Sequence, residues 1–418
     1  MNAKVVTFGC RLNAYESQVM QEHADKAGLE EAIIFNTCAV TKEAERSARQ
    51  AIRKARRENP NAKIIVTGCA AQIDPDGYGG MKEVDQVIGN DLKLKEETWT
   101  GKPTEKLLVN DIMSVTETAS HLVNGFDGKA RAFLQVQNGC DHRCTFCIIP
   151  YGRGNSRSVP IGEIAQAVKH LVEQGYQEVV LTGVDVTSYG PDLPGKPTLG
   201  QMIRRVLALV PDLPRIRLSS LDPVEIDADL WWLIEHEPRL MPHLHLSLQA
   251  GDDMILKRMK RRHNRQDVID VCKRARSLRP DMSFGADIIA GFPTETDEMF
   301  ENSMKIVEEC DLTFLHVFPY SEREGTPAAK IPANKQVPVP IRKERAAKLR
   351  GLGEAQLAVF NERQIGKQVQ IIVEKDNVGH SECFAEVHFD DPLPIGSLAI
   401  VYITSLVDGR LFGKIVSQ

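Results

Sequence analysis

No hydrophobic run in the sequence approaches the ~18 residues that a membrane-spanning helix requires. The first ten residues also lack the apolar core of a secretory signal peptide. Cysteine occurs nine times, an odd number in a chain without a secretion signal, which indicates a reducing compartment rather than a disulfide framework. We therefore expect a cytoplasmic protein that has no membrane partner.

An excess of basic charge is missing too: the net charge is −5, so the whole chain is not an obvious nucleic-acid binder. The basic residues are nevertheless grouped, and each group alone is typical of a solvated surface. Three such groups on an acidic chain favour a localised surface for a polyanion. The groups are Arg46, Arg49, Arg53, Lys54, Arg56 and Arg57; Lys257, Arg258, Lys260, Arg261 and Arg262; and Arg342, Lys343, Arg345, Lys348 and Arg350.

The length of 418 residues, with 42% hydrophobic and 26% charged residues, is typical of a globular chain of two or three domains. The order of strand-like and helix-like segments predicts an α/β protein. We expect an N-terminal parallel-sheet domain at 1–115 and a linker at 116–129. A partial TIM-type barrel of six βα units should fill 130–361, and a small antiparallel β-barrel should fill 362–418.

In the first domain, three predicted strands each end just before a cysteine. The strands are 4–9, 32–35 (which leads into Asn36-Thr-Cys38) and 63–68, with helices predicted at 15–27 and 42–58 and a fourth strand at 84–88. Parallel strands place their carboxyl ends along one edge, where ligand sites collect. Cys10, Cys38 and Cys69 should therefore converge and form a three-thiol site, although three buried structural cysteines remain an alternative.

From residue 131 the alternation of strands and helices resumes six times. In such barrels the chemistry belongs at the carboxyl ends of the strands. The predicted strands are 131–137, 178–182, 215–220, 243–249, 283–290 and 314–320, and the predicted helices are 161–174, 198–209, 225–236, 265–278, 295–309 and 341–361.

A cysteine triplet with C-x3-C-x2-C spacing, Cys140, Cys144 and Cys147, follows the first of these strands. A fourth ligand is missing from this stretch, whereas a structural zinc site takes four ligands and an electron-transfer cluster usually takes four cysteines. Three cysteines on an iron–sulfur cube would leave one iron open to another ligand. Zinc completed by His142 or by a distant cysteine is the alternative.

Polar residues and turn residues follow the ends of the other barrel strands in a common register. Each is weak evidence alone, because a glycine or proline after a strand usually marks a turn. Together they predict a cofactor-binding rim composed of Gly183, Asp185, Ser219, Ser247, Gln249, Arg258, Asp287, Gly291 and Pro293.

The last part of the chain contains short strands at 368–373, 383–389, 398–403 and 411–416, separated by turn residues. This pattern is typical of a small antiparallel β-barrel. Such barrels often bind oligonucleotides, but a module that only packs against the rest of the protein fits the pattern equally well.

Over essentially its whole length the sequence resembles the methylthiotransferases of the radical S-adenosylmethionine (AdoMet) superfamily. The resemblance is carried by Gly9-Cys10-Arg-Leu-Asn13 with Glu16-Ser17, by Asn36-Thr-Cys38 and Thr67-Gly-Cys69, and by Cys140 to Cys147 with the following Pro150-Tyr-Gly-Arg153-Gly154. It implies a three-cysteine domain, a radical AdoMet barrel and a terminal barrel called TRAM. It also implies two [4Fe–4S] clusters, held by Cys10, Cys38 and Cys69 and by Cys140, Cys144 and Cys147, with AdoMet bound at the barrel rim.

Within the family, Cys10-Arg-Leu-Asn13 and the Ala-Val-Thr41 after Cys38 are most similar to the branch that modifies threonylcarbamoyladenosine 37 of tRNA. Lysine is common in that branch where Arg11 stands. The implied reaction adds a methylthio group at C2 of the adenine, with an external electron donor and a sulfur donor. The residues expected to contact RNA, together with the terminal barrel, are Lys257, Lys260, Arg261, Arg262, Arg342, Lys343 and Arg345.

The sequence leaves three alternatives to this function open. The substrate could be isopentenyladenosine 37 of tRNA or an aspartate of a ribosomal protein, both of which other branches of the family modify. The third alternative is a non-catalytic iron–sulfur protein that binds RNA. Such a protein would have no use for an iron that lacks a protein ligand or for an AdoMet-binding rim.

Overall fold

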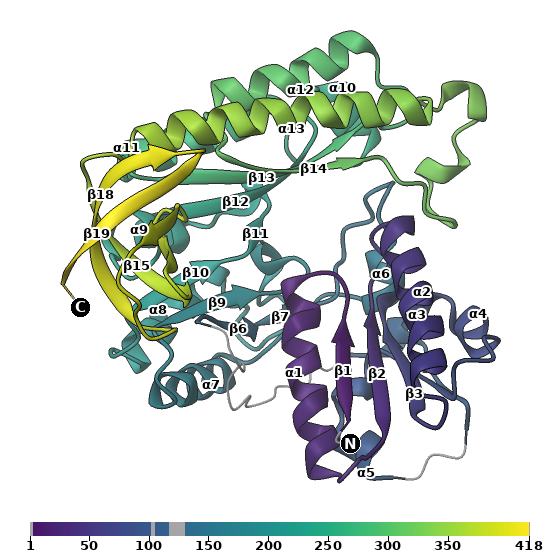
Figure 1. Cartoon of the computed structure of the whole chain (residues 1–418). Helices are drawn as coiled ribbons and strands as arrows, with labels where there is room; N and C mark the ends of the chain where they lie inside the picture. Colours follow the sequence, from purple (N-terminus) through teal and green to yellow (C-terminus); the bar gives the residue numbers. More distant parts are fainter. Residues whose placement is uncertain (1–2, 102–104, 117–129, 418) are drawn as a thin grey trace.

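The computed structural model describes residues 3–101, 105–116 and 130–417. It contains a parallel sheet, an arc of parallel strands with helices outside it, and a closed β-barrel at the C-terminal end (Figure 1). The predicted α/β class and its three architectures are confirmed. The domain limits stay predictions, and most of the expected linker lies outside the described residues.

The N-terminal sheet has the strand order β1-β2-β3-β4-β5, and all four neighbouring pairs are parallel. Four of its strands were predicted, whereas the two-residue β5 was not. Apolar cores cover both faces of the sheet. The elements are β1 (Lys4–Thr7), α1 (Arg11–Lys26), β2 (Ala32–Thr37), α2 (Lys42–Glu58), β3 (Lys63–Gly68), α3 (Cys69–Ile73), α4 (Pro75–Gly79), β4 (Gln86–Ile88), α5 (Glu96–Thr100) and β5 (Leu107–Leu108).

The partial barrel forms from strands whose side chains alternate between two environments. In β12, Leu244, Leu246 and Leu248 pack in the core beneath the helices, so His243 and His245 face the inner side of the arc. The third strand is interrupted at Ser219, which separates β10 from β11. The strands are β6 (Ala132–Gln135), β9 (Glu178–Thr182), β10 (Arg215–Leu218), β11 (Ser220–Leu221), β12 (His243–Gln249), β13 (Ser283–Ala290) and β14 (Phe314–Pro319), with a side pair β7 (Gln137–Asn138) and β8 (Arg157–Ser158).

The helices of this part lie close to their predicted positions. Polar caps fix several of their starts: Thr198 and Gln201 form a capping box at α8, and Asn264 and Asp267 form one at α11. The helices are α6 (Ile149–Arg153), α7 (Ile161–Glu173), α8 (Leu199–Leu209), α9 (Ala228–His236), α10 (Asp253–Arg258), α11 (Arg265–Leu278), α12 (Asp297–Glu309) and α13 (Val339–Glu362).

The C-terminal barrel closes in the order β15-β16-β17-β19-β18. Its pairs are antiparallel except for β17 and β19, which run parallel, and the short β16 was not predicted. The strands are β15 (Gln368–Lys375), β16 (Val378–Ser381), β17 (Glu386–Phe389), β18 (Leu398–Val407) and β19 (Arg410–Ser417).

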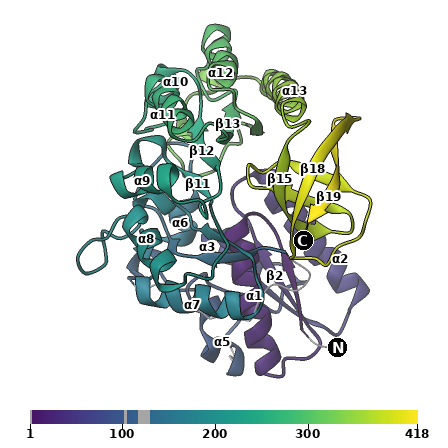
Figure 2. The same ribbon diagram turned by 90° about the vertical axis from the view of Figure 1, so that its left-hand side faces the viewer.

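Contacts between the parts fix their relative positions. Helix α1 of the first domain packs against β6, the edge strand of the arc, and the C-terminal barrel lies beside the arc (Figures 1 and 2). There Arg217 donates to the carbonyl of Glu382 at 3.1 Å, and Ser283 donates to that of Cys383 at 2.7 Å. The terminal barrel therefore forms part of the packed structure. No helix among the described residues is long and apolar enough to cross a membrane.

Candidate functional site

Cys10, Cys38 and Cys69 follow the ends of β1, β2 and β3, which are neighbours in the sheet. Two glycines, Gly9 and Gly68, allow the segments that carry these cysteines to pack closely. A Cβ at Gly9 would lie 2.8 Å from Cys38 Sγ, and a Cβ at Gly68, where φ is +97°, would lie 2.3 Å from the backbone of Thr37. The structure therefore brings Cys38 against the turn before Cys10 and β3 tightly against β2, and a common site for the three thiols stays a prediction.

Burial and the neighbouring Cys69 and Cys10 raise the pKa of Cys38 to about 12. Cys10 is exposed, whereas Cys38 and Cys69 are buried. Thiols in such a site ionise when they bind a metal, because metal ligation deprotonates a coordinating thiol.

Arg153, from α6 of the barrel part, reaches into this site although it follows Cys147 by six residues. Its Nε donates to Cys69 Sγ at 3.2 Å, and its other nitrogens donate to Asn13 Oδ1 at 2.6 Å and to Glu16 at 2.6 and 2.9 Å. The side chain is 2% exposed. The sequence motif contained Arg153 and Glu16, but nothing in it showed that they meet.

Glu16 is the counter-charge at this junction. Its carboxylate also accepts from Lys93 Nζ at 2.6 Å, and both side chains are fully buried. Burial opposes ionisation, but the adjacent Arg153 and Lys93 outweigh it and lower the pKa of Glu16 to about 2. A buried carboxylate thus joins the first domain to the barrel.

We expect Glu16→Gln to destabilise the metal-free protein by on the order of 3 kcal/mol at neutral pH. The stabilising effect of a carboxylate with a depressed pKa is complete above its unfolded value, near 4.5, and is lost as the pH falls toward 2. Urea unfolding at several pH values should therefore show the gap between wild type and variant closing across that interval. The exposed Glu43, paired with Arg46, provides the control Glu43→Gln, for which no such gap is expected.

The cysteine triplet lies after β7, and the backbone around it is fastened to the basic segment after α10. Thr145 N donates to Met259 O at 3.0 Å, and Thr145 Oγ1 donates to Arg258 O at 2.8 Å. Arg261 Nη1 lies 3.6 Å from Cys144 Sγ. Each cysteine set therefore has one guanidinium in contact with a sulfur, Arg261 here and Arg153 in the first domain.

The two sets lie near each other. Burial is the main cause that raises the pKa of Cys147 to about 12, and Cys69 of the other set also contributes to that rise. Gly152 lies against Cys69, since a Cβ there would be 3.2 Å from Cys69 Cβ. The structure thus places the two predicted cluster sites on either side of α6.

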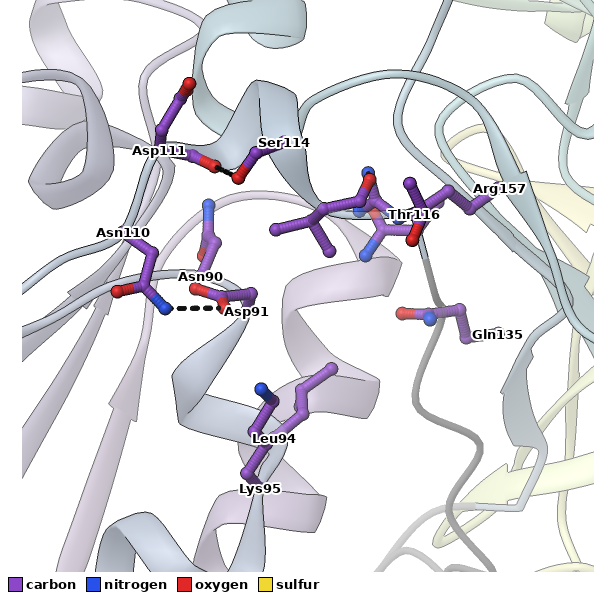
Figure 3. A pocket seen from close by; sticks show the side chains of 12 residues that line it. Asn90, Asp91, Leu94, Lys95, Asn110, Asp111, Ser114, Thr116, Gln135 and Arg157 are labelled. Carbon is purple, nitrogen blue, oxygen red and sulfur yellow. Dashed lines mark hydrogen bonds between the residues drawn. The ribbon is translucent and has the colours of Figure 1, made fainter.

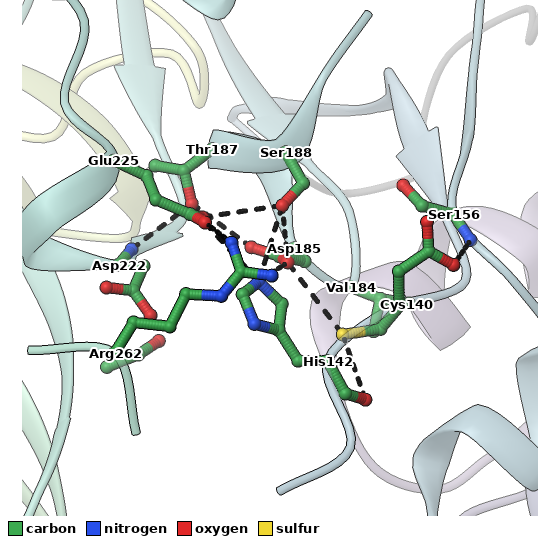
Figure 4. Close-up of polar contacts among 12 residues, drawn as sticks. Cys140, His142, Ser156, Val184, Asp185, Thr187, Ser188, Asp222, Glu225 and Arg262 are labelled. Carbon is green, nitrogen blue, oxygen red and sulfur yellow. Dashed lines mark hydrogen bonds and ion pairs between the residues drawn. The ribbon is translucent and has the colours of Figure 1, made fainter. Parts of the chain in front are cut away.

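His142, inside the triplet, belongs to a polar network (Figure 4). Its Nε2 lies 2.7 Å from Asp185 Oδ2 and 3.6 Å from Glu225 Oε1, and these two carboxylates raise its pKa to about 10. The ligand atoms of Cys140, His142 and Asp185 lie within 4.8 Å of one another, so the alternative of zinc completed by His142 stays open on geometry. Asp185 Oδ2 also lies 3.8 Å from Cys140 Sγ, which places this rim residue beside the triplet.

Two of the predicted rim residues, Gly183 and Ser219, have distinctive local surroundings. Gln137 Oε1 accepts from the backbone nitrogens of Val184 and Asp185 at 3.0 and 2.9 Å, and Gly183 leaves room for that side chain. Ser219 Oγ is buried without a hydrogen-bond partner, at the interruption between β10 and β11. An orphaned hydroxyl beside a strand end fits a polar ligand such as AdoMet.

The other rim residues are spread along the strand ends, and their assignment to AdoMet stays a prediction. Ser247 and Gln249 lie at the end of β12, where Gln249 has a φ of +71°. Arg258 is exposed and donates to Thr294 Oγ1 at 2.7 Å, next to Pro293. Gly291 N donates to the buried Glu295, and Asp287 lies between His245 and His316 in the middle of β13.

The structure divides the seven basic residues expected to contact RNA into two classes. Arg342 is buried and donates to carbonyls of Val337 and Tyr320, and Arg345 is buried against Glu295 and Asp297. Arg261 is held by Asp222 and the cysteine loop. The side chains that remain exposed to a phosphate are Lys257, Lys260, Arg262 and Lys343, although Arg262 pairs with Glu225.

We expect the double change Lys257→Gln and Lys260→Gln to weaken tRNA binding and to reduce the slope of log K against log salt by about 1.4–1.8. Neither ammonium group pairs with a described residue, so neither change breaks an internal contact. Filter binding over a salt series measures the slope. Lys169→Gln with Lys196→Gln removes two exposed charges elsewhere, and an equal effect from that pair would contradict a local RNA surface.

A cavity of about 560 Å³ lies between the first domain and the barrel (Figure 3). Asn138, which accepts from Arg153, is part of its wall, and both amide atoms of its Gln135 are buried without partners. None of the predicted site residues lines it. The wall consists of Asn90, Asp91, Leu94, Lys95, Asn110, Asp111, Ser114, Val115, Thr116, Gln135, Asn138 and Arg157.

Comparisons with known proteins define the class first. The family profile described as the radical SAM superfamily matches residues 134–307, and the uncharacterized protein family UPF0004 matches residues 2–89. The fold is similar to that of TsrM from Kitasatospora setae, a radical S-adenosylmethionine methyltransferase, with a TM-score of 0.57 and 14% identity over 79% of this chain and 75% of that one. This likeness concerns the fold alone.

Relatives then define the family. The chain is 59% identical to threonylcarbamoyladenosine tRNA methylthiotransferase MtaB of Rickettsia prowazekii, over 98% of this chain and 97% of that protein. The protein of the same name from Aquifex aeolicus is 36% identical over 96% and 100%. A tRNA-2-methylthio-N(6)-dimethylallyladenosine synthase from Oceanobacillus iheyensis is 32% identical over 99% and 83%. The chain belongs to the radical AdoMet methylthiotransferase family.

Proposed function

We propose that this enzyme adds a methylthio group to C2 of N6-threonylcarbamoyladenosine 37 in the anticodon loop of tRNA. The observation that carries the proposal is the 59% identity, over nearly the whole of both chains, to a protein named for that substrate. The relative named for dimethylallyladenosine is considerably less similar, at 32% identity. A tRNA substrate also implies that the enzyme works in the cytoplasm.

The residues present fit the cofactors of the family, two [4Fe–4S] clusters and AdoMet. Each cysteine set offers three sulfur ligands, which leaves one iron of a cube without a protein ligand. We assign one cluster to Cys10, Cys38 and Cys69 and the other to Cys140, Cys144 and Cys147. AdoMet would then bind at the rim, where Asp185 and the unpartnered Ser219 Oγ lie.

When bound, these groups supply one-electron chemistry on AdoMet and sulfur for transfer, which the protein positions. The chain contributes placement: α6 holds the two cysteine sets close together, and Arg153 and Arg261 each donate to a sulfur. An external one-electron donor and a sulfur donor complete the proposal. A base in an anticodon loop can enter such a site at a small free-energy cost, because it is already largely unpaired.

The test uses tRNA from a strain that lacks the gene and carries threonylcarbamoyladenosine without the methylthio group. The reconstituted enzyme, given AdoMet, reductant and sulfide, should convert that nucleoside to its 2-methylthio form, as measured by liquid chromatography and mass spectrometry. tRNA carrying isopentenyladenosine 37 should remain unmodified. Modification of the isopentenyl nucleoside instead would assign the chain to the other branch.

A further inference from the structure

Arg11 is the first residue of α1 and directly follows Cys10. Its guanidinium makes no hydrogen bond or ion pair with any residue in the described part of the chain, although its side chain is partly buried. Other guanidinium groups near the junction are paired: Arg153 makes five hydrogen bonds, and Arg131 pairs with Glu374 at 2.5 Å. An unpaired cation at this position requires an explanation.

The surroundings of Arg11 carry an excess of positive charge. Arg131 and Arg217 are the cations that act most strongly on Arg11. The two carboxylates in range, Glu178 and Glu374, are already bonded to those same arginines. The environment therefore favours binding of an additional anion.

On the inner face of the arc, His245, Asp287 and His316 form a second polar cluster that the cysteine sites do not use. Asp287 Oδ1 lies 3.2 Å from His245 Nε2 and 3.3 Å from His316 Nδ1, and the two rings are 4.8 Å apart. The three residues come from neighbouring strands β12, β13 and β14. His316 is 57% exposed, so this cluster is accessible.

Arg11 and this cluster are both near His243, on the inner face of the strand arc. His243, two residues before His245 on β12, stacks on Phe384 at 5.0 Å, and Arg217 lies 5.2 Å from the same ring. Arg11 and His316 are among the charged groups that act electrostatically on His243. Helix α1 packs against β6 at the open edge of the arc, which lets its first residue approach the inner face.

We propose that Arg11 binds the carboxylate of the threonylcarbamoyl group of the substrate, with the His245–Asp287–His316 cluster receiving the polar remainder of that group. The inference rests on the proposed function, because that substituent is what gives the base its negative charge. A guanidinium matches a carboxylate with two parallel hydrogen bonds. Since Arg11 adjoins Cys10, a base whose C2 lies at the first cysteine site brings its N6 substituent to this residue.

The experiment measures equilibrium binding of fluorescent anticodon stem-loops to the reconstituted enzyme without AdoMet. Four RNAs differ only at position 37: adenosine, isopentenyladenosine, threonylcarbamoyladenosine, and glycinylcarbamoyladenosine, which keeps the carboxylate but lacks the hydroxyl and methyl groups. Wild type should bind both carboxylate-bearing RNAs about 10- to 100-fold more tightly than the other two.

Arg11→Gln should remove this preference while leaving the affinity for unmodified RNA unchanged, and Arg11→Lys should retain part of it. Lys26→Gln, an exposed change at the other end of α1, should behave as wild type. Iron content is measured for every variant, because Arg11 adjoins a cluster cysteine. Arg11→Lys provides the comparison if Arg11→Gln loses iron.

A preference that persists in Arg11→Gln at normal iron content would overturn the inference, as would a wild-type enzyme that methylthiolates threonylcarbamoyladenosine yet binds all four RNAs equally. In both cases the proposed function stands. If wild type does not methylthiolate that nucleoside at all, the proposed function itself fails and the inference fails with it.

Discussion

Cys38→Ala should abolish methylthiolation while leaving reductive cleavage of AdoMet to 5′-deoxyadenosine intact. Cys38 is buried between Cys10 and Cys69 and is distant in sequence from the triplet at the barrel rim. Iron in the anaerobically reconstituted protein should fall from about eight to about four atoms per chain, the content of one cubane cluster. Cleavage is followed by chromatography of 5′-deoxyadenosine, and sulfur transfer by mass spectrometry of tRNA nucleosides.

Two further variants sharpen this test. Cys144→Ala should also lower iron to about four atoms but should eliminate both activities. Cys272→Ala removes a buried cysteine that lies on α11, outside both sets, and should keep the full iron content. Unchanged iron in Cys38→Ala would mean that the cysteines of the first domain are structural.

Glu178→Gln should lower the free energy of unfolding by about 3–5 kcal/mol, because it leaves several buried guanidinium groups without their counter-charge. Glu178 is fully buried, its Oε1 accepts from Arg217 Nε at 2.7 Å, and Arg215 and Arg131 lie within 3.8 Å of its carboxylate. Urea unfolding followed by circular dichroism measures the loss.

The matched control is Glu173→Gln, five residues away in the chain. Glu173 is exposed and its 4.0 Å contact with Lys169 is a surface pair, so its removal should cost less than about 1 kcal/mol. Equal losses in the two variants would show that the buried network around Glu178 contributes nothing specific.

The sequence predicted most of the fold because strands and helices of a βα protein leave a local signal. Strands 178–182, 243–249 and 283–290 were located at the residues where β9, β12 and β13 are found. The missed strands are short: β5 and β8 have two residues each and β16 has four, too few for an alternation to be recognised. The interruption at Ser219 leaves no local signal either.

The placement of the three cysteines along one edge of the sheet was also predictable, because parallel strands share an edge. The contacts of Arg153 with Glu16 and Cys69 were not, since they join residues 137 and 84 positions apart. Hydrophobic periodicity reports which face of an element is buried, but it does not say which distant charge pairs with which.

The burial of Arg342 and Arg345 could have been anticipated. They lie three residues apart on α13 and share a helical face with the buried Ala346 and Leu349. A run of basic residues shows how much charge a helix carries, whereas the spacing shows which face each charge lies on. In α13 the spacing places Arg342 and Arg345 on the buried face.

The position of Arg153 has a consequence for the nascent protein. Translation proceeds at about 5–20 residues per second, so the 84 residues between Cys69 and Arg153 take roughly 4–17 s to synthesise. Over that interval the N-terminal sheet can leave the ribosome with Glu16 paired to Lys93, while Cys69 still lacks its guanidinium. The first cysteine site is completed only when the segment that contains the second has been made, which couples the maturation of the two sites.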